Sequence, residues 1–292
     1  MGTRVEIQLW SEDPAQAARL LAAGMAEFDR IEALMSTYIP DSEMSRVNRL
    51  AADEPQPVTE ELFQLLQKAR EISDLTEGAF DITFDSVGQF YDFRQRQRPD
   101  PLEISEHLDN IDFRQVVLNE AKKTVAFSAK GVRINLGGIA KGHSVEQVIA
   151  LLADAGVTQA LATAGGDTRL LGKRGDKPWV VGIRDPNDEN AIFTRVALDD
   201  EAISTSGDYE RFFVEDGTRY HHILSPASGR PVSGVRSVSV IGPSATVTDG
   251  LSTSVFVMGP EKGMELIARL PDYEALIITD GEYYYSPGLL PD

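Results

Sequence analysis

Asp249 and Thr253 stand four positions apart, and both carry oxygen donors. On a helix, residues at this spacing lie on the same side, so the carboxylate and the hydroxyl would face one site. Two hard oxygen donors suit Mg²⁺, which takes few protein ligands and completes its shell with water and phosphate oxygens. In the alternative interpretation, the commoner one for such a pair taken alone, Asp249 caps a helix and Thr253 bonds to a carbonyl.

Lys141 lies in a glycine-rich turn that runs from Gly137 to Gly142. The preceding segment, 131–136, reads as a short strand, and apolar residues at helical spacing follow the turn until Gly156. Glycines let a ligand approach the backbone closely, and the first N–H groups of a helix can bind an anion. The turn therefore indicates a phosphate site within reach of Lys141, although turns of this kind are also common without a ligand.

His222 is a candidate general base, because an imidazole exchanges protons near neutral pH. It follows a hairpin signal, Asp216-Gly217, and is adjacent to His221; these are two of only four histidines in the chain. Neighbouring strand residues point to opposite faces, so we expect at most one of the two to face a given site. A histidine in a strand is also commonly structural.

Two further glycine-centred turns, 164–167 and 204–209, are rich in small hydroxyls and backbone donors. Such turns often only connect strands. Tyr38, in the polar loop 36–43, has a ring that can stack on a planar ligand or pack on its own loop.

Composition narrows the class of protein. The 292 residues are 42% hydrophobic and 25% charged, as in a soluble globular protein. A formal charge of −18 argues against nucleic acid or an anionic membrane as the main partner, and it favours a divalent cation beside any anionic ligand. With no cysteine, disulfides, thiolate metal sites and cysteine nucleophiles are excluded. No apolar segment reaches the length of a membrane span.

These residues must be positioned by a mixed fold. A strand is expected at 3–10, a helix at 14–35, and a second helix after an N-cap at Thr59, closed by Gly78. Past an exposed loop at 95–100, strands are expected at 157–163, 168–171, 179–184, 193–198, 211–214, 237–240 and 275–279, with helices after Gly142, at 249–258 and at 261–270. Strands grouped apart from helices predict an α+β fold with largely antiparallel sheets. No linker divides the chain, so residues 1–292 are expected to form a single domain.

Taken together and in order, these segments resemble the ApbE family of FAD:protein FMN transferases over nearly the whole chain. The resemblance rests on this succession of motifs: Met1-Gly2-Thr3, Met35 to Tyr38, Asp41 to Ser45 with Asn48, Gly78 to Asp81, Gly137 to Gly142, Ala164 to Asp167, Ser204 to Tyr209, His222 to Pro231, and Asp249 to Thr253. Any one of them can arise by chance, whereas the ordered set is specific.

The resemblance implies a T-fold-like α+β core that binds FAD with Mg²⁺ on its pyrophosphate. Family members transfer the FMN half of FAD to a threonine hydroxyl of a partner flavoprotein, such as an Nqr/Rnf-type subunit, and release AMP. By position, the flavin nucleotide is expected to contact Met1, Tyr38, Ala79, Phe80, Asp81, Asn135, Lys141 and Ile223. Mg²⁺ is expected at Asp249 and Thr253, with the carbonyl of Gly138 and the neighbouring Ser252, and His222 is expected beside the acceptor hydroxyl.

Three residues depart from the family pattern. Asn135 stands where aspartate is usual, Ser225 where an acidic or amide residue is common, and His143 where tyrosine is frequent. None of them removes a proposed metal ligand. The resemblance also leaves two other activities open: a Mg²⁺-dependent FAD pyrophosphatase that gives FMN and AMP, and an FAD-binding protein without catalysis.

Location follows only from the resemblance. In exported members the Met-Gly-Thr motif lies downstream of a signal peptide and a lipid-anchored cysteine, so a periplasmic, lipid-anchored protein is expected, with a cytoplasmic one as the alternative.

Overall fold

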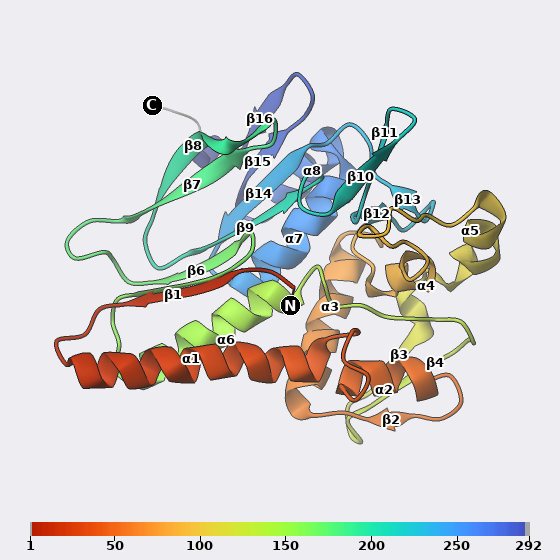
Figure 1. Cartoon of the computed structure of the whole chain (residues 1–292), viewed down its shortest axis with the longest axis horizontal. Helices are drawn as coiled ribbons and strands as arrows, with labels where there is room; N and C mark the ends of the chain where they lie inside the picture. Colours follow the sequence, from red (N-terminus) through yellow and green to blue (C-terminus); the bar gives the residue numbers. More distant parts are fainter. Residues whose placement is uncertain (1, 290–292) are drawn as a thin grey trace.

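The computed structural model describes residues 2–289, and its centre is an entirely antiparallel seven-stranded sheet (Figure 1). The strand order is β1 (Val5–Leu9), β5 (Ala160–Ala164), β6 (Asp167–Leu171), β9 (Ala202–Gly207), β14 (Ser237–Gly242), β15 (Glu274–Ile278) and β16 (Tyr283–Tyr285). The expected α+β class with antiparallel sheet is confirmed.

One face of this sheet is covered by helices. They are α6 (Ala140–Asp154) and α7 (Ala245–Met258), with α1 (Pro14–Met35) outside α6 and α8 (Pro260–Ile267) beside α7 (Figure 1). Alternation along the strands divides the core: Val238 and Val240 of β14 pack with α7, whereas Ile241 packs on the opposite face. There the hairpin of β7 (Trp179–Asp185) and β8 (Asp188–Leu198) completes the second apolar layer.

A second core lies at the other end of the molecule. It joins α2 (Glu43–Leu50) and α3 (Glu60–Leu75) to a small sheet of β2 (Gln56–Pro57), β4 (Thr124–Phe127) and β3 (Val116–Asn119). The remaining elements are α4 (Asp85–Gly88), α5 (Pro101–His107), the 3₁₀ turns Ile82–Phe84, Leu108–Asn110, Phe113–Gln115 and Pro287–Leu289, and the hairpins β10 (Phe212–Glu215) with β11 (Thr218–His221) and β12 (Leu224–Ser225) with β13 (Arg230–Pro231).

Local signals placed several elements correctly. Asp13 caps α1 by accepting from Ala15 N at 2.8 Å, and Thr59 caps α3 through Leu62 N at 3.4 Å. Gly78, at φ 85°, closes α3 by donating its N–H to Ser73 O at 2.8 Å. No helix within residues 2–289 is long and apolar enough to cross a membrane.

Two expectations about local structure are wrong. Segment 131–136 is extended but belongs to no sheet, because its backbone bonds to side chains: Asn48 both donates to Ile134 O and accepts from Ile134 N. Residues 204–207 are not a turn; they form the end of β9, paired with both β6 and β14. The hydroxyls of this central strand are satisfied by its neighbours: those of Ser204 and Ser206 bond to α7, and that of Thr205 bonds to β14.

Candidate functional site

Helix α7 carries Asp249, Ser252 and Thr253 towards one end of the sheet. The helix begins at Ala245, so Asp249 lies in its second turn and the alternative reading of Asp249 as an N-cap is wrong. The capping role belongs to Glu146 of α6, whose Oε2 accepts from Ala245 N at 2.5 Å and from Ser244 Oγ at 3.1 Å. The carboxylate of Asp249 is therefore left to face the site.

Gly142, in the first turn of α6, allows α6 and α7 to touch. A Cβ at this position would lie 2.1 Å from Ala245 O and 2.7 Å from Asp249 Cβ. With only hydrogen there, Gly142 N donates to Asp249 Oδ2 at 2.9 Å. The glycine thus fixes the orientation of a carboxylate that is 1% exposed.

Lys141 projects from the same turn into a pair of buried carboxylates. Its Nζ lies 2.6 Å from Asp167 Oδ2 and 3.0 Å from Asp249 Oδ1. Although burial opposes the charged form, the two carboxylates raise the pKa of Lys141 above its usual value. Burial, reinforced by the negative charge of Asp249 and opposed by Lys141, raises the pKa of Asp167 to about 7.

Asp167 is fully buried at the start of β6, yet neither carboxylate oxygen accepts a well-directed hydrogen bond within residues 2–289. Its contact with Lys141 is an ion pair of short distance but poor hydrogen-bond direction. Buried acceptors without such partners are uncommon and costly unless a ligand, ion or water completes them. The cation that compensates this carboxylate within the described residues is the ammonium of Lys141.

Strand β9, which packs against α7, supplies hydroxyl groups to the site. Ser206 Oγ lies 2.9 Å from Ser252 Oγ and 3.3 Å from Thr253 Oγ1, while Ser204 Oγ lies 2.8 Å from Thr248 Oγ1. Ser252 also donates to Asp249 O at 2.9 Å. This network sets the positions of the hydroxyls on α7.

Gly138 lies between Thr253 and Phe80. A Cβ built there would be 3.1 Å from Thr253 Oγ1 and 3.2 Å from Phe80 Cε2. The glycine turn and the 79–81 segment therefore meet at Thr253, as the predicted site requires. Phe80 is buried and Ala79 is half-buried beside it.

Asp81 and Asn135 are held by their neighbours. Asp81 is buried, accepts from Thr83 N at 2.8 Å and Phe113 N at 2.9 Å, and has its pKa raised by burial. Asn135 accepts from Gly137 N at 2.9 Å and donates from Nδ2 to Asp85 Oδ1 at 3.2 Å. The contact of either residue with a flavin stays a prediction.

The two adjacent histidines have different surroundings: β11 ends at His221, and His222 lies in the bend that follows it, so the expected alternation within a strand does not apply. His221 is buried, bonds through Nε2 to Val232 O at 2.7 Å and accepts on Nδ1 from Ile223 N at 3.3 Å, which makes it structural. His222 has a buried Nδ1 with no hydrogen-bond partner among residues 2–289. Burial, with smaller effects of the Arg211, His221 and Lys141 charges, lowers the pKa of His222 to about 3.

Three more residues were predicted to contact the flavin nucleotide: Ile223, Tyr38 and Met1. Ile223 is buried directly after His222, whereas Tyr38 is 84% exposed in its loop. A side chain so exposed has little to hold it in place, so a role in stacking stays a prediction. Met1 lies outside the described residues.

The donor set fits a magnesium ion. Asp249 offers a carboxylate and Thr253 a hydroxyl, and Asp167 adds a second buried carboxyl group beside Lys141. Gly138 lies next to Thr253, and the use of its backbone carbonyl as a further ligand stays a prediction. Within residues 2–289 no three histidine, aspartate or glutamate side chains are grouped to hold a metal. A metal at Asp249 would therefore depend on hydroxyl, carbonyl and substrate oxygens.

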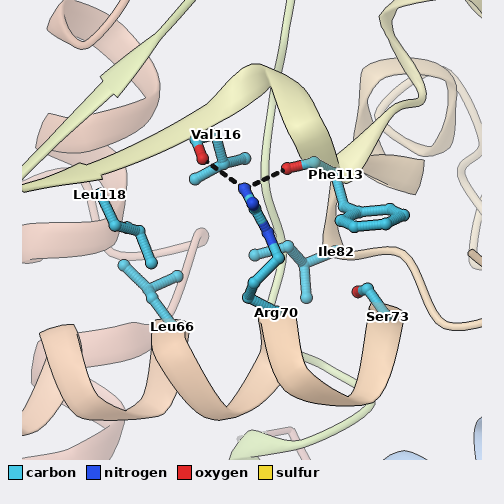
Figure 2. Close-up of a pocket in the computed structure, with 7 residues that line it drawn as sticks. All are labelled: Leu66, Arg70, Ser73, Ile82, Phe113, Val116 and Leu118. Atoms are coloured by element: carbon cyan, nitrogen blue, oxygen red, sulfur yellow. Dashed lines mark hydrogen bonds between the residues drawn. The ribbon is translucent and has the colours of Figure 1, made fainter. Parts of the chain in front are cut away.

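The small cavity drawn in Figure 2 is a packing defect rather than a binding site. Its volume of ≈10 Å³ is close to the minimum for one water molecule. Arg70 of α3 is one of the residues that line it and donates to Phe113 O at 2.8 Å and to Val116 O at 2.5 Å (Figure 2). The guanidinium is thus used to fasten β3 to α3.

Sequence reasoning missed Asp167 and Ser206 as members of the site. Both lay in segments noted as turns and as motifs of the resemblance, but neither residue was given a role, and neither has a spacing relation to Asp249 along the chain. Ser206 gave no signal of a strand face, because the three successive residues Ser204, Thr205 and Ser206 all carry hydroxyls and show no alternation. Asp167 had no signal either, because only the packing of α6 against β6 brings it to Lys141.

Comparison with known proteins identifies the family of the chain. The chain is 34% identical to the FAD:protein FMN transferase of Treponema pallidum, covering 95% of this chain and 82% of that protein, and 33% identical to that of Vibrio cholerae, covering 90% and 81%. Its fold matches the crystal structure of the ApbE protein of Thermotoga maritima with a TM-score of 0.90 and 33% identity, over 98% of this chain and 94% of that one. The flavin transferase ApbE of Vibrio cholerae matches with a TM-score of 0.87 and 30% identity, over 98% and 94%. Since the ApbE family model also matches residues 1–277, the chain belongs to the ApbE family.

Proposed function

We propose that this protein is an FAD:protein FMN transferase that moves the FMN half of FAD, with Mg²⁺, to a threonine hydroxyl of an acceptor flavoprotein and releases AMP. The observation that carries the proposal is the convergence of Asp249, Thr253, Lys141 and Gly138 at one end of the sheet, within electrostatic reach of His222. The names of the relatives support the same activity.

The chain's own residues would act mainly by positioning and charge. Asp249, Thr253 and the carbonyl of Gly138 would hold Mg²⁺, which when bound neutralises the pyrophosphate and so favours attack at phosphorus. Lys141, at the start of α6, would orient the phosphates through its ammonium group. A chain of charge −18 needs such local cations to retain an anionic substrate.

His222 would accept the acceptor's proton. The threonine oxygen forms a bond to the FMN phosphorus, the bond from that phosphorus to the AMP oxygen breaks, and the threonine proton passes to the imidazole. His222 is suited to this because it is neutral at physiological pH and its Nδ1 is unpaired within the described residues. The negative charge of bound phosphates would raise its pKa towards the useful range.

The test is incubation of the enzyme with FAD, Mg²⁺ and an acceptor flavoprotein, with the acceptor's threonine changed to alanine as a matched control. We expect the acceptor to gain the mass of FMN with an equal release of AMP, and the control acceptor to gain nothing. FMN and AMP released equally with either acceptor would establish a pyrophosphatase instead. FAD left intact would overturn both enzymatic readings.

The metal site is tested in the same assay with Asp249→Asn, which keeps the size of the side chain. We expect transfer to fall by at least about a hundredfold, since a ligand charge is lost where the pyrophosphate charge must be offset. Full activity in Asp249→Asn would contradict the assignment of Asp249 as the metal ligand.

A further inference from the structure

The carboxylate oxygen of Asp249 that would bind a metal ion is already paired with a cation, the ammonium of Lys141. Asp249 Oδ2 accepts from Gly142 N at 2.9 Å, which leaves Oδ1 to face the site. Lys141 Nζ donates to that Oδ1 at 3.0 Å. The ammonium therefore sits at the atom where the proposed magnesium ion would bind.

Lys141 is held there by a second carboxylate. Asp167 Oδ2 lies 2.6 Å from its Nζ, and Asp167 and Asp249 are 0% and 1% exposed. Two buried carboxylates without a cation would repel each other strongly at low effective dielectric. One lysine thus compensates charge that would otherwise oppose folding of this part of the protein.

A divalent ion and an ammonium cannot share Asp249 Oδ1 without strong repulsion. Lysine has a flexible stem of four methylenes, and the Lys141 side chain is 28% exposed, so it can move towards the open side of the site. Lys141 is itself the second residue of α6, next to the glycine turn where the phosphates of the substrate are expected. Metal entry would therefore release the ammonium in the direction of the phosphates.

We propose that Lys141 is a resident cation that occupies the metal position of the Asp167–Asp249 pair until a divalent ion displaces it from Asp249. This inference rests on the metal site of the proposed function. It adds that Lys141 and the metal ion compete for Asp249 Oδ1. Metal entry moves the ammonium from a carboxylate to the substrate, so metal and FAD each favour the binding of the other. Without substrate, the lysine keeps metal affinity low.

The test measures metal binding in the absence of FAD. Mn²⁺ serves as the probe because it binds oxygen ligands and its free form is counted by electron paramagnetic resonance. We expect Lys141→Met to bind Mn²⁺ at least about tenfold more tightly than the wild type, because a neighbouring positive charge is removed. Lys262→Met, on the exposed side of α8, is the matched control and should bind as the wild type does.

Equal or weaker Mn²⁺ binding by Lys141→Met would overturn the competition. If that variant does not fold, Lys141→Gln and a crystal structure of the wild type with Mn²⁺ answer the same question: Nζ should have left Asp249 Oδ1, and a lysine still bonded there beside the metal would refute the proposal. Asp249→Asn separates the two ideas. If it binds Mn²⁺ as well as the wild type does, the metal site itself is wrong; if it loses binding while Lys141→Met is unchanged, only the competition fails.

Discussion

Gly142 and Asp249 are joined by a hydrogen bond of 2.9 Å from the backbone N–H to Oδ2, at the point where α6 crosses α7. The bond exists only because residue 142 has no side chain, since a Cβ would lie 2.1 Å from Ala245 O. One contact therefore both packs two core helices and orients a proposed metal ligand.

Gly142→Ala should consequently cost both stability and activity. The added methyl must push α7 away from α6, and overpacking of a buried contact costs about 1–3 kcal/mol or more when backbone is the obstacle. We expect the free energy of unfolding in urea to fall by at least that amount and Mg²⁺-dependent turnover to fall with it. Gly281→Ala, with no atom within 4 Å of the added Cβ, is the control and should change neither. If Gly142→Ala has the same free energy of unfolding and the same turnover as the wild type, α6 and α7 can move apart at this contact without cost, and the prediction is wrong.

Ser206 should tune the metal site through its contacts with Ser252 and Thr253. Loss of a group that orients metal ligands typically lowers metal affinity about 10–100-fold. We expect Ser206→Ala to need that much more Mg²⁺ for half-maximal activity, with stability little changed.

The neighbouring Thr205→Ala provides the control for Ser206→Ala. Thr205 lies on the opposite face of β9, where its Oγ1 pairs with Ser239 Oγ at 2.8 Å. The Mg²⁺ dependence of this variant should match the wild type. Equal shifts in both variants would indicate a general loosening of β9 rather than an effect of Ser206 on the ligands.

The contrast between Ser206 and Asp249 also shows what could be read from the sequence. The spacing of Asp249 and Thr253 is a local property of one helix, and the caps at Asp13 and Thr59 are local too, so these features were predictable. The role of Ser206 depends on β9 pairing between β6 and β14, a contact between distant segments. The run of small hydroxyl residues in β9 is typical of a turn. Its strand conformation comes from pairing with its neighbours and packing against α7.

Segment 131–136 was predicted to be a strand but pairs with no other strand. Val132, Ile134 and Leu136 are all buried, and this alternation is the pattern of a strand. The pattern correctly gave the direction of the side chains. It could not reveal that the backbone would be satisfied by Asn48, 86 residues earlier, instead of by another strand.

His222 should make stability depend on pH. Its pKa is lowered from about 6.5 to about 3 in the folded protein, so between these values the unfolded chain binds a proton that the folded chain does not. The stability linked to this group is thus present above pH 6.5 and is lost as pH falls towards 3. We expect His222→Gln to lose less stability between pH 7 and pH 4 than the wild type, measured by urea unfolding at each pH. Parallel losses in the two proteins would mean that His222 titrates normally.

Asn135 is held against the buried carboxylate of Asp85, so an aspartate at position 135 should be unfavourable in this chain. Asn135 Nδ2 donates to Asp85 Oδ1 at 3.2 Å, and Asp85 also pairs with Arg133 Nε at 2.6 Å while burial raises its pKa. Asn135→Asp would place a second carboxylate against Asp85 in a site with one cation. We expect it to destabilise the protein by about 1–3 kcal/mol.

The sign of the pH effect identifies the cause. Repulsion raises the folded-state pKa of the paired carboxyls above their unfolded values, so stability is retained at low pH and lost as pH rises through the raised pKa. The penalty of Asn135→Asp should therefore be larger at pH 8 than at pH 5 in urea unfolding. The double variant Asn135→Asp with Asp85→Asn exchanges the two groups and should recover part of the loss, giving a coupling energy of about 1 kcal/mol or more. Strictly additive effects of the two substitutions would show that residues 135 and 85 do not interact.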